Sequence, residues 1–313
     1  MSNLIISTSP HIQTNKTTTS VMRDVLIALA PAAIASVILF GLRSLILILA
    51  SVAAAVLTEF LFNLAVKKKQ TVGDLSAAVT GLILALTLPA HAPIWQTVIG
   101  SVFAILVVKC LFGGLGCNFA NPAATGRVFI LLAFSEMGGG AATRFMTEIE
   151  AGSTPLEIMK DGVTEGLPSV INMLFGNRAG ALGETCVIAI FLGFLYLVLR
   201  RVIKWHVPVI FVATVFLLTL AIKQDVNLAM YQMLSGGLLF GAVFMATDYV
   251  TTPLNTLGKM VFALGCGIIT VLIRLFGSYP GGVTFAILLM NIISPYIEKL
   301  TMKKPFGGKK NEK

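Results

Sequence analysis

Charged side chains are scarce in this sequence. Asp, Glu, Lys and Arg make up only 12% of its 313 residues, whereas hydrophobic residues make up 56%, and the mean hydropathy is +0.90. A water-soluble globule needs far more polar surface than this composition supplies, so that class of protein is excluded. The sequence therefore indicates an integral membrane protein.

Cysteine and histidine are also rare, and they are scattered. The four cysteines form no CxxC pair, and the three histidines fall in separate predicted loops. Small apolar packing residues are the better interpretation of the cysteines, with a ligand role shared with another subunit left open for Cys117. No metal site is predicted. The chain also has neither a Rossmann glycine pattern nor a P-loop, so it carries no nucleotide-binding fingerprint.

Apolar runs long enough to cross a bilayer as helices recur along the chain, and Pro, Gly or charged residues separate them. About ten spans are predicted on this basis, which makes the fold an all-α polytopic membrane protein. Asn121, Pro122 and Arg127 interrupt the first half of the fifth span, which indicates a broken or re-entrant helix. The predicted spans cover residues 24–41, 44–66, 74–90, 94–112, 119–135, 180–200, 206–222, 231–248, 257–276 and 283–300.

The net charge of +9 comes from basic residues at helix ends and not from one soluble face, so we expect no nucleic-acid partner. More of these basic residues lie in the loops on one side of the membrane, which is the side that also holds both termini. The positive-inside rule identifies that side as the cytoplasm. The inside set is Lys16, Arg23, Lys67, Lys68, Lys69, Arg200, Arg201, Lys204, Lys259 and the tail from Lys299, and the outside set is Arg43, Arg144, Lys160, Arg178, Lys223 and Arg274. The chain divides into a cytoplasmic tail (1–23), a first membrane repeat (24–135), an extracytoplasmic segment (136–179), a second membrane repeat (180–300) and a basic cytoplasmic tail (301–313).

An internal repeat supports this division. The stretch that starts Leu75-Ser-Ala-Ala resembles the one that starts Leu234-Ser-Gly-Gly, and each is followed by an apolar span that ends in Leu-Phe-Gly, at residues 111–113 and 275–277. Each half then contributes an odd number of spans, so the two five-helix repeats must be inverted in the bilayer. Inverted repeats place a site near the midplane, at broken helices that contain Gly and Pro. Close helix packing is the alternative explanation of any single small residue.

Two further motifs indicate binding. In the first, Gly113, Gly114 and Gly116 permit backbone conformations that other residues rarely adopt, and Asn118 and Asn121 supply side-chain hydrogen bonds. The second motif, Phe244-Met-Ala-Thr-Asp-Tyr-Val-Thr-Thr-Pro253, puts the carboxylate of Asp248 among several hydroxyls. Asp248 either coordinates a cation or caps a helix.

Thr154 is the most informative residue of the long polar interval. It lies in Ala151-Gly-Ser-Thr-Pro-Leu156, where a hydroxyl on a Gly-Pro turn is placed to carry a covalently attached group. The alternative is structural, because Ser153-Thr154-Pro155 followed by Glu157 is typical of a helix N-terminus.

These motifs together resemble a known family. The strings GGLGCNFANPAATGR (113–127), AGSTPL (151–156), FMATDYVTTP (244–253) and YPGGVTFAILLMNIISPYI (279–297) occur in this order over nearly the full chain. They are similar to the D component of the Rnf membrane complex (RnfD), a ferredoxin:NAD oxidoreductase, and more distantly to the B component of the sodium-translocating NADH:quinone reductase. One string alone would be weak, but four in order are specific.

The resemblance implies a covalent flavin. In that family FMN is joined through its phosphate to a threonine hydroxyl outside the cytoplasm, and the matching position here is Thr154, preceded by Gly152. The surrounding pattern departs from the family at Glu148, Ala151 and Ser153, which leaves Ser153 as a rival acceptor. Arg144, Lys160 and Arg178 are candidates to neutralise the phosphate. The family also implies a second, non-covalent flavin, riboflavin, among the spans.

The implied function is that of one component in a redox-driven ion pump of the bacterial plasma membrane. This component would relay electrons between ferredoxin and NAD, with Na+ or H+ translocation coupled to the flow, and it would not be active alone. The implied partners are the Rnf components A, B, C, E and G, together with membrane lipid, and NAD would bind another component. Asp248 is the candidate ion-coupling residue. The alternatives are a urea-type or ammonium-type channel or secondary transporter, and a structural anchor for a redox assembly.

Overall fold

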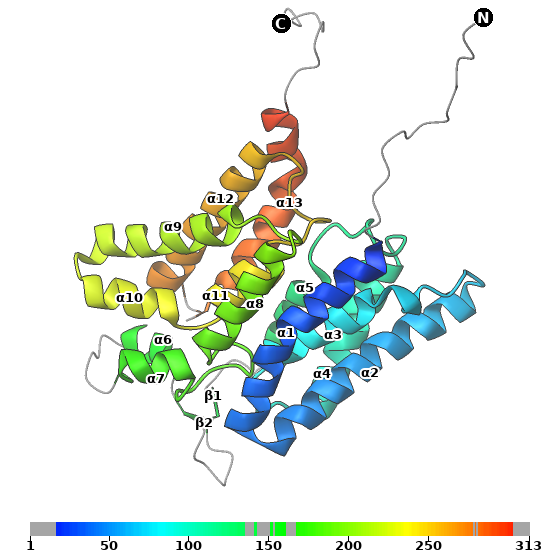
Figure 1. Ribbon diagram of the computed structural model, residues 1–313, viewed down its shortest axis with the longest axis horizontal. Helices are drawn as coiled ribbons and strands as arrows, with labels where there is room; N and C mark the ends of the chain where they lie inside the picture. Colours follow the sequence, from blue (N-terminus) through cyan, green and yellow to red (C-terminus); the bar gives the residue numbers. More distant parts are fainter. Residues whose placement is uncertain are drawn as a thin grey trace, which may run out of the picture.

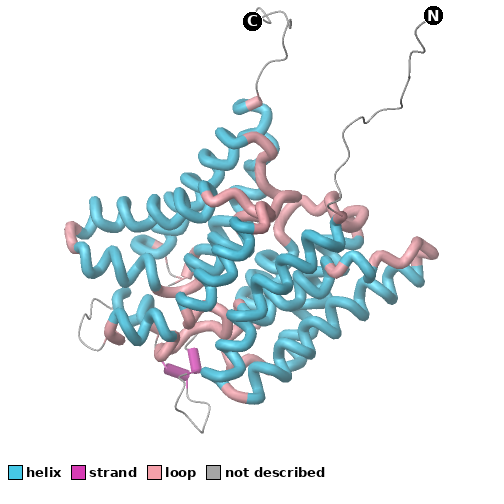
Figure 2. The backbone as a smooth tube through the Cα atoms, viewed as in Figure 1, coloured by secondary structure: helices cyan, strands magenta, loops and turns pink. Residues whose placement is uncertain are grey.

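The chain folds into helices joined by short turns (Figures 1 and 2). The computed structural model describes residues 17–134, 141–142, 151–152, 154–160, 167–277, 279 and 281–302. The first half consists of α1 (Thr18–Phe40), α2 (Leu42–Ala65), the 3-10 turn η1 (Val72–Asp74), α3 (Ser76–Leu86), α4 (Ile94–Phe103) with its π-helical continuation η2 (Ala104–Cys110), and α5 (Pro122–Ala133).

The middle and second half contain the remaining elements. The two-residue strands β1 (Ala141–Ala142) and β2 (Ala151–Gly152) pair antiparallel, and the short helices α6 (Pro155–Lys160) and α7 (Val170–Phe175) follow. The second half comprises α8 (Val187–Leu199), α9 (His206–Lys223), α10 (Val226–Leu234), α11 (Leu238–Phe240) with the π-helical segment η4 (Gly241–Met245), α12 (Thr256–Phe276) and α13 (Val283–Thr301).

Five of the described helices are long and apolar enough to cross a membrane by themselves: α1, α2, α9, α12 and α13. The pair formed by α10 and the segment 238–245 counts as a sixth if it is one span with a 60° bend. Four shorter apolar helices, 76–86, 94–110, 122–133 and 187–199, occupy the remaining predicted span positions. A helical protein that passes the membrane several times is therefore confirmed.

Local sequence explains where several helices begin and end. Thr17, Asn121 and Asn255 cap the N-termini of α1, α5 and α12, because each side chain accepts a hydrogen bond from a free backbone N–H of the first turn. Gly41, with φ of +76°, ends α1 and lets the chain reverse into α2.

Two predicted spans differ from the observed helices. The span predicted for 180–200 is helical only from Val187, because Gly180 and Gly183 and the polar residues between them and Cys186 form turns instead. The span predicted for 231–248 begins earlier, at Val226, and is broken at Ser235–Gly237. The fifth predicted span starts late, at Pro122, but α5 then runs unbroken through Arg127 to Ala133, so the broken helix expected there is not observed.

The turns gather at two ends of the bundle. At one end, Lys204 Nζ donates to Thr256 Oγ1 (3.1 Å), Asn255 Nδ2 donates to Thr301 Oγ1 (2.8 Å), and Arg200 pairs with Asp24 (3.3 Å). At the other end the 86–93 turn packs on the turn before α8, where Gly183 N donates to Leu86 O (2.7 Å). The short helices α6 and α7 belong to this second end, called the α6 end below (Figure 1).

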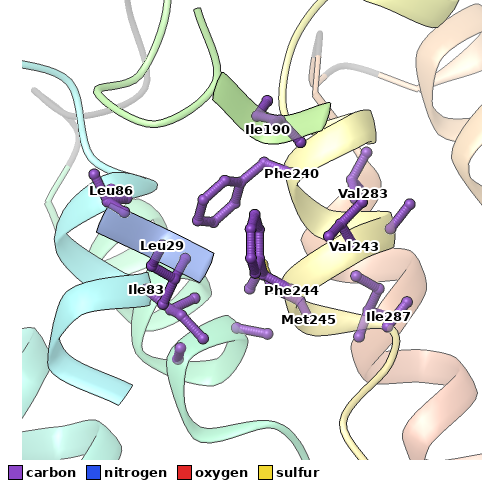
Figure 3. Packing of buried hydrophobic residues seen from close by; sticks show 14 of the residues in the cluster. Leu29, Ile83, Leu86, Ile190, Phe240, Val243, Phe244, Met245, Val283 and Ile287 are labelled. Carbon is purple, nitrogen blue, oxygen red and sulfur yellow. The ribbon is translucent and has the colours of Figure 1, made fainter. Parts of the chain in front are cut away.

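The two halves share one core. Figure 3 shows Leu29, Ile83 and Leu86 of α1 and α3 facing Phe240 and Phe244 of the second half. The two phenylalanine rings lie 5.1 Å apart, and Phe240 is fully buried. Across this core α1 packs against α8, and α5 packs against α13.

Candidate functional site

A cavity of about 160 Å³ opens beside α6 and is lined from both halves of the chain. We call it the Thr154 cavity. Its polar lining includes Thr154, Glu157, Arg127, Arg178 and Glu184, and its aromatic lining includes Phe240, Tyr279 and Phe285. A hydroxyl, buried cations and aromatic rings thus face the same space.

Thr154 starts α6 as the helix cap that the sequence allowed as an alternative. Its backbone N–H donates to Glu157 Oε2 (2.7 Å), and Glu157 N–H donates to Thr154 Oγ1 (3.3 Å). This reciprocal pair is a capping box. The fold thus uses the hydroxyl oxygen as an acceptor, so replacing its proton would leave the capping contact in place.

Two arginines reach the Thr154 cavity from different elements. Arg178 follows α7, is 6% exposed, and donates from Nη2 to Glu184 O (2.7 Å). Its Nε and Nη1 and the Nη1 of Arg127 on α5 are buried without a hydrogen-bond partner among the described residues. Burial lowers the pKa of Arg178 to about 10, with Glu184 opposing the shift, so the group remains cationic at neutral pH.

The broken helix between α10 and α11 forms one wall of the cavity. The break frees carbonyl groups, and Arg274 of α12 satisfies two of them, donating to Gln232 O (2.5 Å) and Ser235 O (3.1 Å). Gly236 has φ of +63°, and a Cβ there would lie 2.5 Å from Leu156 Cδ1. A Cβ on Gly237 would collide with the Glu184 carboxylate. The two glycines therefore let α6 and Glu184 approach the backbone closely.

A second cavity, of about 90 Å³, contains the other predicted site residues. Asn118, Asn121 and Asp248 all line this Asp248 cavity, although they come from two distant motifs. Its walls are mostly apolar, with contributions from α1, α3, α8 and η4. The residues predicted to bind flavin therefore fall into two sites, Thr154 in one and the asparagines in the other.

The polar groups of the Asp248 cavity differ in whether they have hydrogen-bond partners among the described residues. Asp248 Oδ1 accepts from Val250 N (3.1 Å) and Oδ2 accepts from Thr251 Oγ1 (3.2 Å), so the carboxylate holds a turn and does not cap a helix, because Asn255 is the N-cap of α12. Asn121 caps α5 and donates from Nδ2 to Met245 O (3.2 Å), joining the two halves. Asn118 Oδ1 is buried without a partner among the described residues. Gly113, Gly114 and Gly116 have φ of +117°, +104° and +91°, as the glycine pattern predicted.

A buried ion pair borders the Asp248 cavity. Lys109 of η2 lines it and donates from Nζ to both carboxylate oxygens of Glu59 (2.9 Å each) and to Ser76 Oγ (2.5 Å). Thr71 Oγ1 also donates to Glu59 (2.6 Å). Lys109 and Glu59 can each be recognised in the sequence as a charge within an apolar span. No sequence pattern indicates that they form an ion pair.

The remaining sequence candidates are placed as follows. Gly152 contributes backbone to β2, and Ser153 and Arg144 lie outside the described residues. Lys160 is exposed at the end of α6, away from the lining of the Thr154 cavity. Among the residues that the structure describes, no group of three His, Cys, Asp or Glu side chains is placed to hold a metal ion.

The fold and cavities define a class: a multi-pass helical membrane protein with a hydroxyl and buried cations in one internal cavity and a mostly apolar second cavity. The profile of the NQR2, RnfD, RnfE family matches residues 5–307, so the chain belongs to this family. The resemblance indicated by the four motifs is confirmed.

Relatives cover nearly the whole chain. The RnfD protein of the Na(+)-translocating ferredoxin:NAD(+) oxidoreductase complex of Acetobacterium woodii is 42% identical, over 99% of this chain and 98% of its own length. The counterpart from the proton-translocating complex of Clostridium ljungdahlii is 38% identical, over 97% and 96%. The counterpart from the ion-translocating oxidoreductase complex of Methanosarcina acetivorans is 32% identical over the full length of both chains. These names include both ions, so family membership alone does not choose between Na+ and H+.

Proposed function

We propose that this chain is the D component of an ion-translocating ferredoxin:NAD+ oxidoreductase complex, in which it relays electrons as one part of a redox-driven pump. Family membership supports the assignment, as does nearly full-length similarity to two proteins named for such a complex and to one named for an ion-translocating oxidoreductase complex. The other components, A, B, C, E and G, are the proposed partners, and one of them binds NAD.

The proposal assigns covalent FMN to Thr154, through a phosphoester. The observation that carries it is the position of the Thr154 hydroxyl, which lines a cavity together with arginines and aromatic side chains. The hydroxyl serves the capping box as an acceptor, which an ester oxygen can still do weakly. When bound, the flavin supplies the capacity to accept and donate electrons, and its tether keeps it at high local concentration near its partners.

We assign the non-covalent riboflavin to the Asp248 cavity. Its apolar walls suit a ring system, and the buried Asn118 Oδ1 needs a donor that the described residues do not supply. Asp248 beside it is the proposed ion-coupling residue, for Na+ or H+. Coupling then depends on how this carboxylate responds to charge changes in the same cavity.

The proposed architecture has ten crossings arranged as two inverted five-helix repeats, with both termini in the cytoplasm of a bacterial cell and the Thr154 segment outside the plasma membrane. The packing pattern supports the repeat. In each half the second helix packs on the third and fourth (α2 on α3 and α4, α9 on α10 and α12), and the fourth packs on the fifth (α4 on α5, α12 on α13). Helices α1 and α8 are proposed equivalents and pack on each other, as do α5 and α13. A twofold axis between the halves brings the equivalent helices that lie beside it into contact.

The test is to purify the chain from a host that also supplies the flavin transferase and to measure the mass of the peptide spanning Arg144 to Lys160. A mass increase equal to esterified FMN is expected, with ultraviolet fluorescence of the denatured protein in a gel. Thr154→Val should abolish this fluorescence and Ser153→Ala should retain it. The reverse pattern moves the acceptor to Ser153, and an unmodified wild-type peptide removes the covalent flavin assignment, the result expected of a transporter or a structural anchor.

A further inference from the structure

The guanidinium groups at the Thr154 cavity carry more positive charge than the surrounding carboxylates neutralise. We propose that Arg178 and Arg127 bind the phosphodiester of the flavin tether, while Arg274 holds the broken helix that shapes the site. This inference rests on the proposed function and deepens it by naming the groups that hold the anion.

Arg178 is the central residue of the proposed site. One of its nitrogens, Nη2, is used on the backbone carbonyl of Glu184, and the turn that begins at Gly176 fixes its position, with Arg178 N donating to Gly176 O (2.9 Å). Nε and Nη1 remain buried in the cavity wall without a partner among the described residues. Nε and Nη1 lie on different edges of the planar guanidinium, so each offers its own charge-assisted N–H donor to an anion in the cavity.

Arg127 brings a second donor to the same cavity from α5. Its Nη1 also has no hydrogen-bond partner among the described residues. Glu184 lies within electrostatic range of Arg127, Arg178 and Arg274, yet in the described part of the chain none of these guanidinium groups forms an ion pair with it within 4.0 Å. The positive charge of these arginines is therefore not paired with the Glu184 carboxylate.

The charges support one bound monoanion. Of the described residues, Arg127, Arg178, Glu157 and Glu184 line the cavity, and Arg274 lies behind its wall at Gly236, so the local set holds three positive charges and two negative ones. A phosphodiester between Thr154 and the flavin carries one negative charge and would bring this set to neutrality. Burial of an unbalanced charge is costly, so the anion should stabilise the fold as well as sit in it.

The experiment compares thermal stability in two backgrounds. In the flavin-bearing protein, Arg178→Gln should lower Tm by about 3 °C or more, because a charge-assisted contact to the tether is lost. In the flavin-free Thr154→Val background the same substitution should leave Tm unchanged or raise it, because it removes an uncompensated buried charge. Arg127→Gln should behave in the same way, and Arg178→Lys should recover part of the loss.

The control is Lys223→Gln, which removes one positive charge from an exposed residue at the end of α9. Its effect on Tm should be the same in the flavin-bearing protein and in the Thr154→Val background. Fluorescence anisotropy of the native, flavin-bearing protein gives a second readout: it should fall in Arg178→Gln and Arg127→Gln and stay unchanged in Lys223→Gln.

A failure of the proposed function and a failure of the phosphate site give different results. If the wild-type peptide carries no FMN, the proposed function fails before this inference is reached. If FMN is attached but Arg178→Gln and Arg127→Gln shift Tm equally in both backgrounds and leave the anisotropy unchanged, the arginines have only a structural role and the phosphate site is wrong. Should Arg178→Gln fail to acquire FMN, Arg127→Gln provides the same comparison.

Discussion

The ion pair between Lys109 and Glu59 gives the sharpest stability prediction. Both side chains are only 3% exposed, and the ammonium lies 2.9 Å from each carboxylate oxygen. Removing one member of such a pair leaves an uncompensated buried charge, which costs about 3–5 kcal/mol. Glu59→Gln and Lys109→Met are each expected to destabilise the protein by roughly this amount.

The double variant tests the reasoning. Once Lys109 is Met, the carboxylate of Glu59 is itself the unpaired charge, so Glu59→Gln should then cost far less than it does in the wild type, or should stabilise. Because each single change is put at about 3–5 kcal/mol and the second should then cost little, the expected coupling energy is about 3 kcal/mol or more, at the top of the range for groups in direct contact. Equilibrium unfolding in mixed detergent micelles measures all four proteins. Additivity within about 0.5 kcal/mol would refute the claim that the two charges are paired inside the fold.

Two further predictions follow from packing and from the Asp248 turn. Gly193→Ala should destabilise by about 1–3 kcal/mol in the same unfolding assay, because its Cβ would meet the backbone oxygen of Ala28 and lie 2.8 Å from Phe244 Cζ, whereas Gly73→Ala, which meets nothing within 4 Å, should be close to neutral. Asp248→Asn should keep the contact with Val250 N and cost under about 1 kcal/mol, yet abolish ion transport by the assembled complex in membrane vesicles. Undiminished transport would remove Asp248 from the coupling mechanism.

Much of the fold was predictable because hydropathy and helix breakers are local signals. Each predicted span contains a helix, and Asn121 and Pro122 mark the start of α5, although Arg127 does not interrupt it. The late start of α8 and the break at Ser235–Gly237 were not, because short Gly and polar stretches also occur inside continuous apolar helices, and a break is compensated only by tertiary contacts such as Arg274 with Ser235 O.

The candidate sites were predictable only in part. Motifs identified Thr154, Asn118, Asn121 and Asp248 one at a time, but no local pattern indicated that they occupy two separate cavities. Arg127 and Arg178 line one cavity although they come from α5 and from the turn before α8, which are far apart in the chain. Long-range contacts of this kind leave no periodic trace in a single sequence.

The shared core between the halves has a consequence for how the protein can move. A carrier that alternates access by rocking would have to part its halves along this seam and expose Leu29, Phe240 and Phe244, which the fold keeps out of contact with lipid and water alike. Because Phe240 and Phe244 of the second half pack on Leu29 of the first, separating the halves would cost this burial. Halves that stay together hold the two cavities at one separation, which suits the electron relay proposed above, because electron tunnelling depends on distance.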